Sequence, residues 1–319
     1  GALVDLIHSH PGQIMFCSDD KHPDELIKGH INELVVRAIK HGCGMFDVLH
    51  AACVLPVQHY NLDVGLLKEG DAADFIVVDN LEDFNVLQTY IDGHLVAEKG
   101  KSLIGRSAVQ PINNFTIKQK SADDFKLLVS ADIAEIECRI IEALDGQLLT
   151  SATTAMLNVK DHNLQTDVSN DILKIGVVNR YHDAPVAIGF IKNFGLSKGA
   201  LASSVAHDSH NIVFVGVDDE SICEAVNAIV RAQGGISLYD GVASMVMPLP
   251  IAGLMSDKDA HQAGAEYQAI DQKAKQMGSR LRAPFMTLSF MALPVIPLLK
   301  MTDKGLFDVQ KFEFVDLQL

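Results

Sequence analysis

Residues 65–100 read GLLKEGDAADFIVVDNLEDFNVLQTYIDGHLVAEKG, and this stretch decides the fold class of the chain. It holds three short runs rich in β-branched and aromatic residues, which is the composition of strands. Turn signals separate the runs: residues 68–71 form one candidate turn, and Asp92–Gly93 is a typical hairpin dipeptide. The sequence therefore predicts a small β domain, which we extend to residues 55–105.

The residues before this domain show a short apolar run followed by helical patterns. Residues 14–17, IMFC, are too few for a helix and predict a strand. Residues 22–42 predict a helix, because Pro23 suits its first turn. A second short helix is expected over residues 46–53.

A polar stretch, RSAVQPINN at residues 106–114, follows the β domain and is the candidate linker. Beyond it, strand and helix patterns alternate. The apolar run IVFVGV at 212–217 predicts a buried strand, and an aspartate directly after it is expected to cap a helix. Residues 106–319 therefore predict an α+β domain, and α+β is the expected fold class of the whole chain.

One uncharged run, APFMTLSFMALPVIPLL at residues 283–299, invites a membrane interpretation. It is barely long enough to span a bilayer, and prolines interrupt it. We interpret it instead as a buried strand followed by an extended, proline-bound segment.

The composition excludes several classes of partner. The chain has 319 residues and a formal net charge of -15, and such a surface repels phosphate backbones and anionic lipid heads. We therefore expect no nucleic acid and no membrane as partners. The 5 cysteines include no CxxC pair, which disfavours a disulfide framework or a zinc knuckle and indicates a reducing, cytoplasmic location.

Two adjacent carboxylates mark the motif FCSDDKHPDEL, residues 16–26. Asp19 and Asp20 follow the predicted strand, and barrel enzymes place catalytic groups at the carboxyl ends of their strands. A carboxylate there can bind a divalent metal and can also take a proton from bound water. The simpler alternative is a helix cap, in which Asp20 or Asp24 accepts hydrogen bonds from free backbone amides.

The sequence in and around the β domain resembles the carboxyl-terminal region of the amidohydrolase superfamily. The resemblance rests on an ordered set: Ala51-Ala52, Pro56, Gly65-Leu66, Gly70, AADFIVVD at 72–79 and YIDGHLVAEKG at 90–100. In that superfamily such a sequence follows the last helix of a (β/α)8 barrel and returns the chain to a β-sandwich. The resemblance implies that residues 1–54 are the last strand–helix unit of a TIM-type barrel and that residues 55–105 belong to the sandwich.

Narrower matches resemble the adenine deaminases of this superfamily. They are SDDKHPDELIKGHI at 18–31, SSVAHDSHNIVFVG at 203–216, GGISLYDG at 234–241 and VMPLPIAGLMSD at 246–257. The last three resemble an extra C-terminal domain that adenine deaminases carry and most amidohydrolases lack. The resemblance implies hydrolysis of adenine to hypoxanthine and ammonia by water activated on a divalent metal, Mn²⁺ or Fe²⁺, with Zn²⁺ as a further candidate.

The same resemblance assigns roles to single residues. Asp19 matches the family's last metal ligand and would carry a proton from metal-bound water toward the purine. Asp20 would contact the substrate, and a swapped assignment of the two stays open. The family's other ligands, on earlier barrel strands, match nothing here. The triplet His8-Ser9-His10 imitates a metal-binding pair but precedes the last strand, and we interpret it as a surface helix end.

A second polar cluster, AHDSHN at residues 206–211, precedes the predicted strand IVFVGV. His207, Asp208 and His210 are dense enough to bind a metal or orient a substrate, and we predict that they bind the substrate. The alternative is a polar loop whose side chains bond to its own backbone.

A TIM-type barrel needs eight strands and roughly 250 residues, so residues 1–54 cannot close one. We therefore expect an engineered segment, a proteolytic fragment or one piece of a split polypeptide, inactive alone and with an incomplete metal site. Its expected partners are adenine, the missing amino-terminal barrel portion and further copies in a homo-oligomer. Two rivals remain: another amidohydrolase, and a non-catalytic binding or regulatory protein built from the C-terminal domain.

Overall fold

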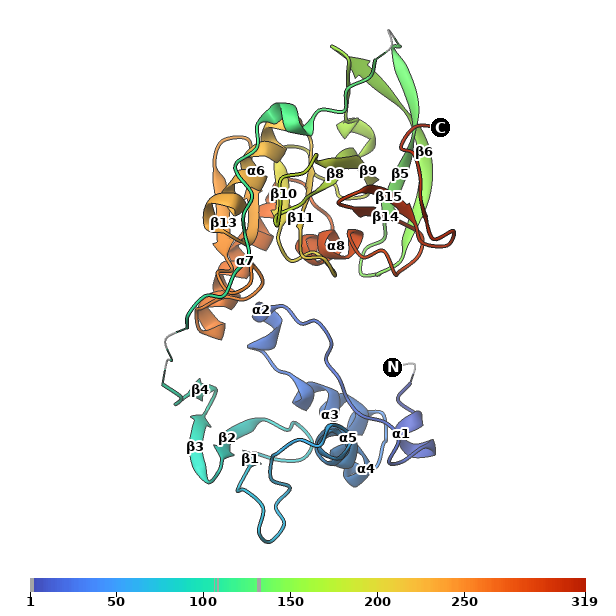
Figure 1. Ribbon diagram of the computed structural model, residues 1–319. Coiled ribbons are helices and arrows are strands. Elements are labelled where there is room, and N and C mark those ends of the chain that lie inside the picture. The colour runs from blue at the N-terminus through green and yellow to red at the C-terminus, as the bar shows by residue number, and fades with distance from the viewer. Residues whose placement is uncertain (1–2, 106, 108, 131–132) are drawn as a thin grey trace. The chain divides into compact units, whose positions relative to one another are not determined.

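The computed structural model describes residues 3–105, 107, 109–130 and 133–319. The chain divides into two compact units, Gly1–Ala108 (unit 1) and Val109–Leu319 (unit 2), which are both drawn in Figure 1. Each unit mixes helices and strands, which confirms the α+β fold class. None of the helices in these described ranges is long and apolar enough to cross a membrane.

The first half of unit 1 consists of short helices around a small apolar core. Val35 and Ala38 pack in this core with Ile7 and Val48. In chain order the helices are α1 (Leu6–Ser9), α2 (Pro23–Leu26), α3 (Ile31–Lys40), α4 (Met45–Leu49), the π-helical turn η1 (His50–Val54) and α5 (Leu55–Tyr60).

Two expectations for this region are wrong. The helix expected over residues 22–42 is two helices, α2 and α3, and the break contains a glycine, which disfavours a continuous helix. Residues 14–17 are not a strand. A strand takes its hydrogen bonds from neighbouring strands, and no strand of the described residues pairs with this segment. Phe16 N donates instead to Ala51 O at 3.3 Å.

The second half of unit 1 is an antiparallel sheet in the order β1-β2-β3-β4. The turn Asp92–Gly93 joins β2 to β3, and both residues have positive φ, 49° and 74°, as a type I′ hairpin turn requires. This hairpin prediction is confirmed. The β structure of the domain predicted over residues 55–105 does not begin at residue 55, because the helix α5 occupies that position. The strands are β1 (Phe75–Val78), β2 (Val86–Ile91), β3 (His94–Glu98) and β4 (Lys101–Ser102).

Unit 2 is built on a 9-stranded sheet in the order β13-β12-β10-β11-β8-β9-β5-β6-β7. Strands β5 and β9 run parallel, whereas the other paired neighbours run antiparallel. The strands are β5 (Glu135–Ala143), β6 (Thr150–Lys160), β7 (Asn163–Leu164), β8 (Ile172–Val178), β9 (Ala187–Lys192), β10 (Ala200–Ser203), β11 (Ile212–Gly216), β12 (Gly235–Tyr239) and β13 (Ser244–Pro248).

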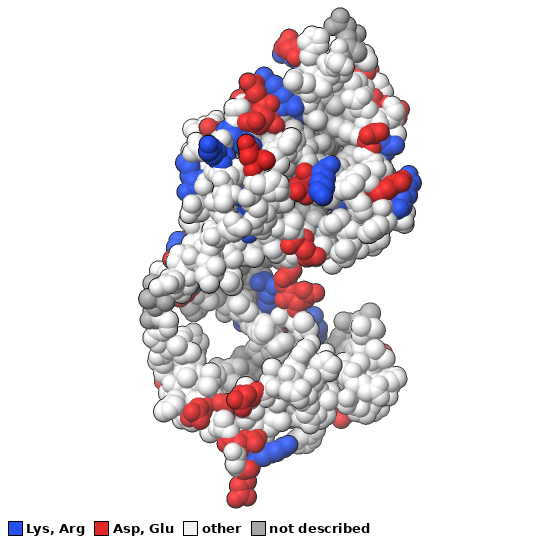
Figure 2. Space-filling model, in the orientation of Figure 1, with Lys and Arg blue, Asp and Glu red and all other residues white. Residues whose placement is uncertain are grey.

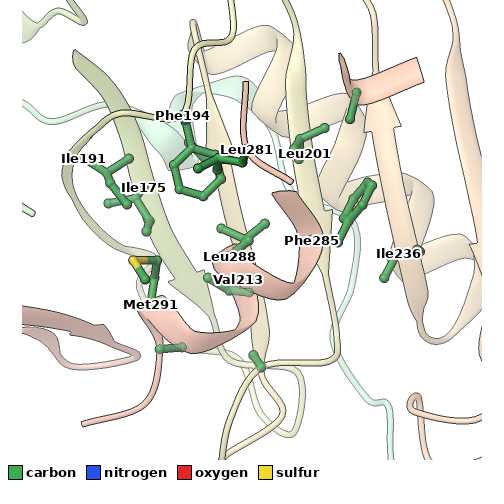
Figure 3. Close-up of a cluster of buried hydrophobic side chains, with 14 of the residues drawn as sticks. Ile175, Ile191, Phe194, Leu201, Val213, Ile236, Leu281, Phe285, Leu288 and Met291 are labelled. Atoms are coloured by element: carbon green, nitrogen blue, oxygen red, sulfur yellow. The ribbon is translucent and has the colours of Figure 1, made fainter. Parts of the chain in front are cut away.

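Apolar clusters lie on both faces of this sheet. Side chains alternate along β11, so Phe214 joins the core shared with α6 (Asp219–Ala232). Val213 joins the other core, together with Leu288 of α8 (Pro284–Met291) and residues of α7 (Ala260–Gln276), as Figure 3 shows in part. The buried strand predicted over 212–217 is thus confirmed.

The strand predicted at the start of the apolar segment 283–299 is wrong. Its first part is the helix α8 and not a strand. Pro284 stands at the first helical position, where the missing amide costs no hydrogen bond. Most of α8 is buried, and a helix that is buried on all sides carries apolar residues on all its faces. Its sequence then lacks the alternation of apolar and polar residues that distinguishes a helix from a strand.

A three-stranded antiparallel sheet follows, with β14 (Leu299–Thr302), β15 (Gly305–Asp308) and β16 (Glu313–Phe314). After it, the backbone runs beside β5. Arg139 N donates to Leu317 O at 2.8 Å, and Leu319 N donates to Glu137 O at 3.1 Å. Strand β9 covers the neighbouring part of β5, residues 140–142. Residues 317–319 therefore pair with the part of β5 that β9 does not cover.

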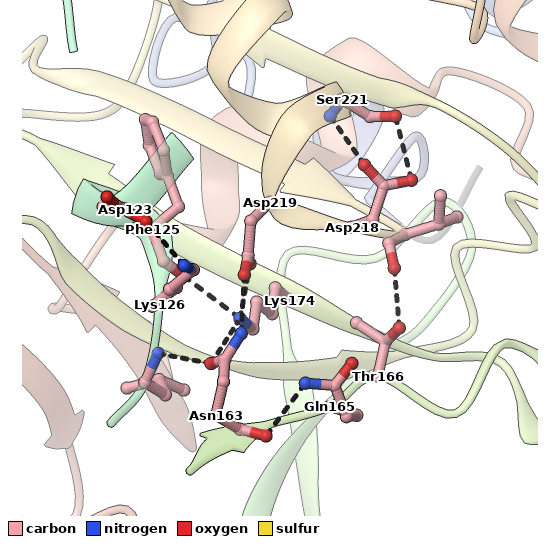
Figure 4. A network of polar contacts seen from close by, with 12 residues as sticks. Asp123, Phe125, Lys126, Asn163, Gln165, Thr166, Lys174, Asp218, Asp219 and Ser221 are labelled. Atoms are coloured by element: carbon pink, nitrogen blue, oxygen red, sulfur yellow. Dashed lines mark hydrogen bonds and ion pairs between the residues drawn. The ribbon is translucent and has the colours of Figure 1, made fainter. Parts of the chain in front are cut away.

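A buried ion pair joins β8 to the start of α6, as Figure 4 shows. Lys174 Nζ and Asp219 Oδ1 lie 2.5 Å apart, with side chains only 2% and 9% exposed. Lys174 Nζ also donates to Phe125 O at 3.1 Å, and Asn163 Nδ2 donates to Asp219 Oδ2 at 2.7 Å. Burial lowers the pKa of Lys174, and the hydrogen bond to Asp219 opposes that effect.

The same end of α6 carries its cap. Asp218 Oδ1 accepts a hydrogen bond from Ser221 N at 2.6 Å, as a helix N-cap does. The cap predicted directly after the strand IVFVGV is therefore confirmed. Asp219, the next residue, is buried and pairs with Lys174.

Candidate functional site

Asp19 and Asp20 lie on an exposed segment just before α2. Asp19 has a φ of 54°, a left-handed conformation that aspartate tolerates better than most residues. Its Oδ1 accepts a hydrogen bond from Asp20 N at 2.8 Å, and its own N donates to Cys17 Sγ at 3.4 Å. Local contacts therefore fix the backbone of Asp19 while its side chain stays exposed.

Neither Asp20 nor Asp24 stands at the cap position of α2. The cap position of α2 is His22, and its side chain makes no capping hydrogen bond. Asp24 lies one step inside the helix, in its first turn. There a negative charge interacts favourably with the helix dipole.

Contacts that the sequence analysis missed hold the segment 18–21. Ser18 Oγ and His30 Nε2 lie 2.8 Å apart. Lys21 Nζ lies 2.7 Å from Glu33 Oε2 and also donates to the backbone ahead of α3. These contacts tie the segment that carries both aspartates to the start of α3. One feature of the sequence could have indicated these contacts. His30 and Glu33 are polar residues three positions apart at the start of α3, and residues at that spacing lie on the same face of a helix.

Asp19 is the one candidate ligand in this segment for the metal that the resemblance implies. No three His, Cys, Asp or Glu side chains within the described ranges are placed to hold a metal ion. A metal site that activates water needs about three protein ligands, so these residues alone do not fit it. His8 and His10 lie at the exposed end of α1, which confirms their interpretation as a surface helix end.

The loop 206–211 connects β10 and β11 in unit 2 and gathers the other predicted residues. His210 has a φ of 50°, and its N donates to Ala206 O at 2.6 Å, which closes a tight turn. The rings of His207 and His210 lie 5.8 Å apart, and Asp208, which follows His207 in the sequence, is exposed. The structure thus brings these three residues together, whereas Asp19 and Asp20 belong to unit 1.

Neighbouring elements hold this loop in place. The His207 ring stacks on Phe290 of α8, with ring centroids 4.7 Å apart. His207 N donates to Ser289 O at 3.3 Å. Tyr181 OH donates to Ser209 O at 2.9 Å. The loop is therefore packed against the rest of unit 2 as well as bonded to its own backbone.

The charges on the visible surface are mixed. On the face shown in Figure 2, the basic side chains are scattered among acidic ones and do not gather into one field. A protein that holds a phosphate backbone presents a basic patch or stripe. The described residues on this face form no such stripe.

The sequence is similar to known families and proteins along nearly its whole length. Residues 2–96 match the amidohydrolase family, and residues 147–313 match the adenine deaminase C-terminal domain. The adenine deaminase of Methanosarcina mazei is 47% identical over 324 residues, which cover 99% of this chain and 58% of that protein. The adenine deaminase of Salinibacter ruber is 49% identical over 316 residues, which cover 98% of this chain and 57% of that protein.

A third relative gives the same result. The adenine deaminase of Borreliella burgdorferi is 46% identical over 305 residues, which cover 95% of this chain and 55% of that protein. The chain therefore spans somewhat more than half the length of these relatives. The resemblance stated from the sequence motifs is confirmed. Because the C-terminal domain model covers more than half of the residues, the chain belongs to the adenine deaminase C-terminal domain family.

Proposed function

We propose that this chain is the carboxyl-terminal part of an adenine deaminase, an enzyme that converts adenine and water to hypoxanthine and ammonia. The observation that carries the proposal is the 47% identity to a protein of that name across 99% of this chain. The match includes both units and does not depend on one shared domain. Another amidohydrolase is disfavoured by the match over residues 147–313, and a purely non-catalytic protein by the match over residues 2–96.

The reaction requires a group that moves protons. Water must lose a proton as its oxygen bonds to the purine carbon, and the leaving amine must gain one. We assign this transfer to Asp19, whose exposed carboxylate sits on a locally fixed turn. Asp20 is assigned to substrate binding. The amidohydrolase family generally uses a divalent metal, and we propose Mn²⁺ or Fe²⁺, with Zn²⁺ as the alternative.

The remaining ligands are assigned to barrel strands outside this sequence, because the described residues do not supply them. The proposal also includes a homo-oligomer in the cytoplasm. An oligomer would cover apolar surface that unit 1 leaves open: Leu3, Phe46 and Leu67 are each at least 70% exposed.

The purified chain alone is expected to release no ammonia from adenine and to bind no stoichiometric metal. The physical reason is that one carboxylate cannot hold and activate a metal-bound water. Ammonia release is measured with Mn²⁺, Fe²⁺ and Zn²⁺ supplied in turn, and bound metal by elemental analysis. The Methanosarcina mazei enzyme serves as the positive control. Metal-dependent turnover by this chain alone would contradict the expectation.

The function itself is tested by supplying the missing part. A fusion of this chain to the amino-terminal portion of the Methanosarcina mazei enzyme, up to the start of the match, is the assembled enzyme for this purpose. It should deaminate adenine and should not hydrolyse dihydroorotate, a substrate type of other amidohydrolases. A soluble, metal-loaded fusion that leaves adenine unchanged would refute the proposal.

For unit 2 we propose that His207, Asp208 and His210 contribute to substrate binding. Their support is geometric: one tight turn carries all three, and the packing of His207 on Phe290 holds it. The exposed carboxylate of Asp208 can accept N–H groups of a base, and a ring nitrogen of His207 or His210 can donate to it.

Replacing His210 by alanine is expected to lower kcat/KM of the assembled enzyme about tenfold, with little change in melting temperature. His162→Ala is the matched control, because His162 is an exposed histidine of unit 2 with a φ of 58°, close to the 50° of His210. Both changes place alanine at positive φ and so share the same backbone cost. Equal kinetic effects, or a fall in melting temperature alone, would leave the loop with a structural role.

A further inference from the structure

The strand β6 has an open outer edge and lies at the margin of unit 2 in Figure 1. It pairs with β5 along residues 150–158, whereas its other neighbour, β7, reaches only Val159 and Lys160. Among the described residues, no strand pairs with the outer side of residues 151–157. Such an edge presents backbone N–H and C=O groups to which another strand can add.

Two hydrogen bonds at the ends of this open stretch show which backbone groups point away from β5. Thr150 N donates to Pro297 O at 3.0 Å. Gln165 N donates to Asn158 O at 2.9 Å. Neither partner belongs to β5, so the backbone groups of residues 150 and 158 point outward and are already occupied.

The free groups lie between these two positions. Successive residues of a strand direct their N–H and C=O groups to opposite sides, so Ala152, Thr154 and Met156 direct theirs outward as residues 150 and 158 do. None of the backbone hydrogen bonds found among the described residues reaches these three from that side. The open stretch is therefore symmetric about Thr154 and closed at both ends.

The sequence of this edge carries nothing that hinders pairing. Residues 150–159 read TSATTAMLNV, with no charged residue, no proline and no glycine. Their pairing with β5 is regular over residues 150–158. Exposed edge strands usually carry a lysine, a proline or a bulge, each of which prevents the addition of another chain. A neutral and regular edge, on a chain with a net charge of -15, is typical of a strand that is covered in the assembled protein.

We propose that two copies of this chain join through β6 about a two-fold axis at Thr154. In this antiparallel register, Thr154 lies opposite Thr154 of the second copy, and Ala152 lies opposite Met156. The outward backbone groups of each pair bond to one another, which joins the two 9-stranded sheets into one. A register shifted by two residues would set a free group against an occupied position, 150 or 158.

The side chains along this edge also fit a second copy. Met156 is 55% exposed. Ala152 lines a cavity of about 330 Å³ together with Leu298 and Leu299. The register brings the methionine of the second copy beside this cavity, and a flexible apolar side chain can fill such an irregular space. Because residues 151–157 are uncharged, no like charges meet at the axis. The inference does not rest on the proposed deaminase function.

Sedimentation velocity of the purified chain at several concentrations tests the proposal, and a dimer that dissociates on dilution is expected. Thr154→Pro removes an outward N–H that the pairing with β5 does not use, and edge strands tolerate proline at such a position. Symmetry removes this hydrogen bond twice, so association should weaken at least about tenfold. The melting temperature shows whether the variant is folded.

Charges at the axis give a second test that does not depend on how the chain tolerates proline. Thr154→Lys and Thr154→Glu should each weaken self-association, because like charges then lie directly opposite one another. A mixture of the two variants should associate more tightly than either variant alone. Asn158→Lys is the matched control, since it adds the same charge to the same strand at a position that Gln165 already closes. It should weaken association less than Thr154→Lys does.

Three results would overturn the proposal. The first is a folded chain that stays monomeric at every concentration. The second is equal weakening by Thr154→Lys and Asn158→Lys. The third is a dimer that none of the Thr154 variants weakens, which would place the contact elsewhere, for example on the exposed apolar residues of unit 1. None of these measurements involves adenine or a metal, so failure here is distinguishable from failure of the deaminase proposal.

Discussion

Replacing Asp19 by asparagine is expected to lower the turnover of the assembled enzyme by at least about 100-fold, the scale of general acid–base catalysis. The change keeps the shape of the side chain and its hydrogen bond with Asp20 N. An amide, however, can neither carry the negative charge nor take up a proton. Steady-state kinetics of adenine deamination measure kcat and KM separately.

The neighbouring aspartate separates the two assignments. Asp20→Asn is expected to raise KM more than it lowers kcat, because we place Asp20 at the substrate. Asp63→Asn is the control, since it removes one exposed carboxylate of unit 1 away from this segment. A near-normal kcat in Asp19→Asn, together with loss of turnover in Asp20→Asn, would reverse the roles of the pair.

The second large effect concerns the stability of unit 2. Replacing Lys174 by methionine is expected to lower its free energy of unfolding by about 3–5 kcal/mol. The reason is that Asp219, whose side chain is 9% exposed, would keep a buried charge without its cation. Chemical denaturation followed by circular dichroism measures the change.

A second substitution and a surface pair serve as controls. Adding Asp219→Asn to Lys174→Met removes both charges, and much of the loss should be recovered. Lys275→Met breaks the pair with Asp271, whose atoms are 2.6 Å apart but whose lysine is 41% exposed. It should cost less than about 1 kcal/mol. Equal costs for Lys174→Met and Lys275→Met would show that burial adds nothing to the first pair.

Features of the fold that depend on neighbours in sequence were predictable. The hairpin at Asp92–Gly93 is set by two residues that tolerate positive φ, and the start of α6 is set by the cap at Asp218. Features set by distant partners were not predictable. Residues 14–17 would need adjoining strands to become a strand, and α8 was misread because burial on all sides erases its periodicity.

The candidate site divides in the same way. That His207, Asp208 and His210 lie together follows from their adjacency in the sequence. The stacking of His207 on Phe290, more than 80 positions away, could not be foreseen, nor could the hydrogen bond between Ser18 and His30. The pairing of Lys174 with Asp219 was hidden as well, because a lysine in an apolar strand reads as an exposed residue.

The pairing of residues 317–319 with β5 has a consequence for synthesis on the ribosome. Strand β5 leaves the ribosome long before its partner, since the bond from Arg139 Nη1 to Gln318 O spans 179 positions. At ordinary elongation speeds of about 5 to 20 residues per second this interval lasts roughly 10 to 40 s. During that time the backbone of residues 137–139 lacks its final partner and can pair with another nascent chain. Slow translation of the β14–β16 region would lengthen this vulnerable period, so the yield of soluble protein should depend on codon choice there.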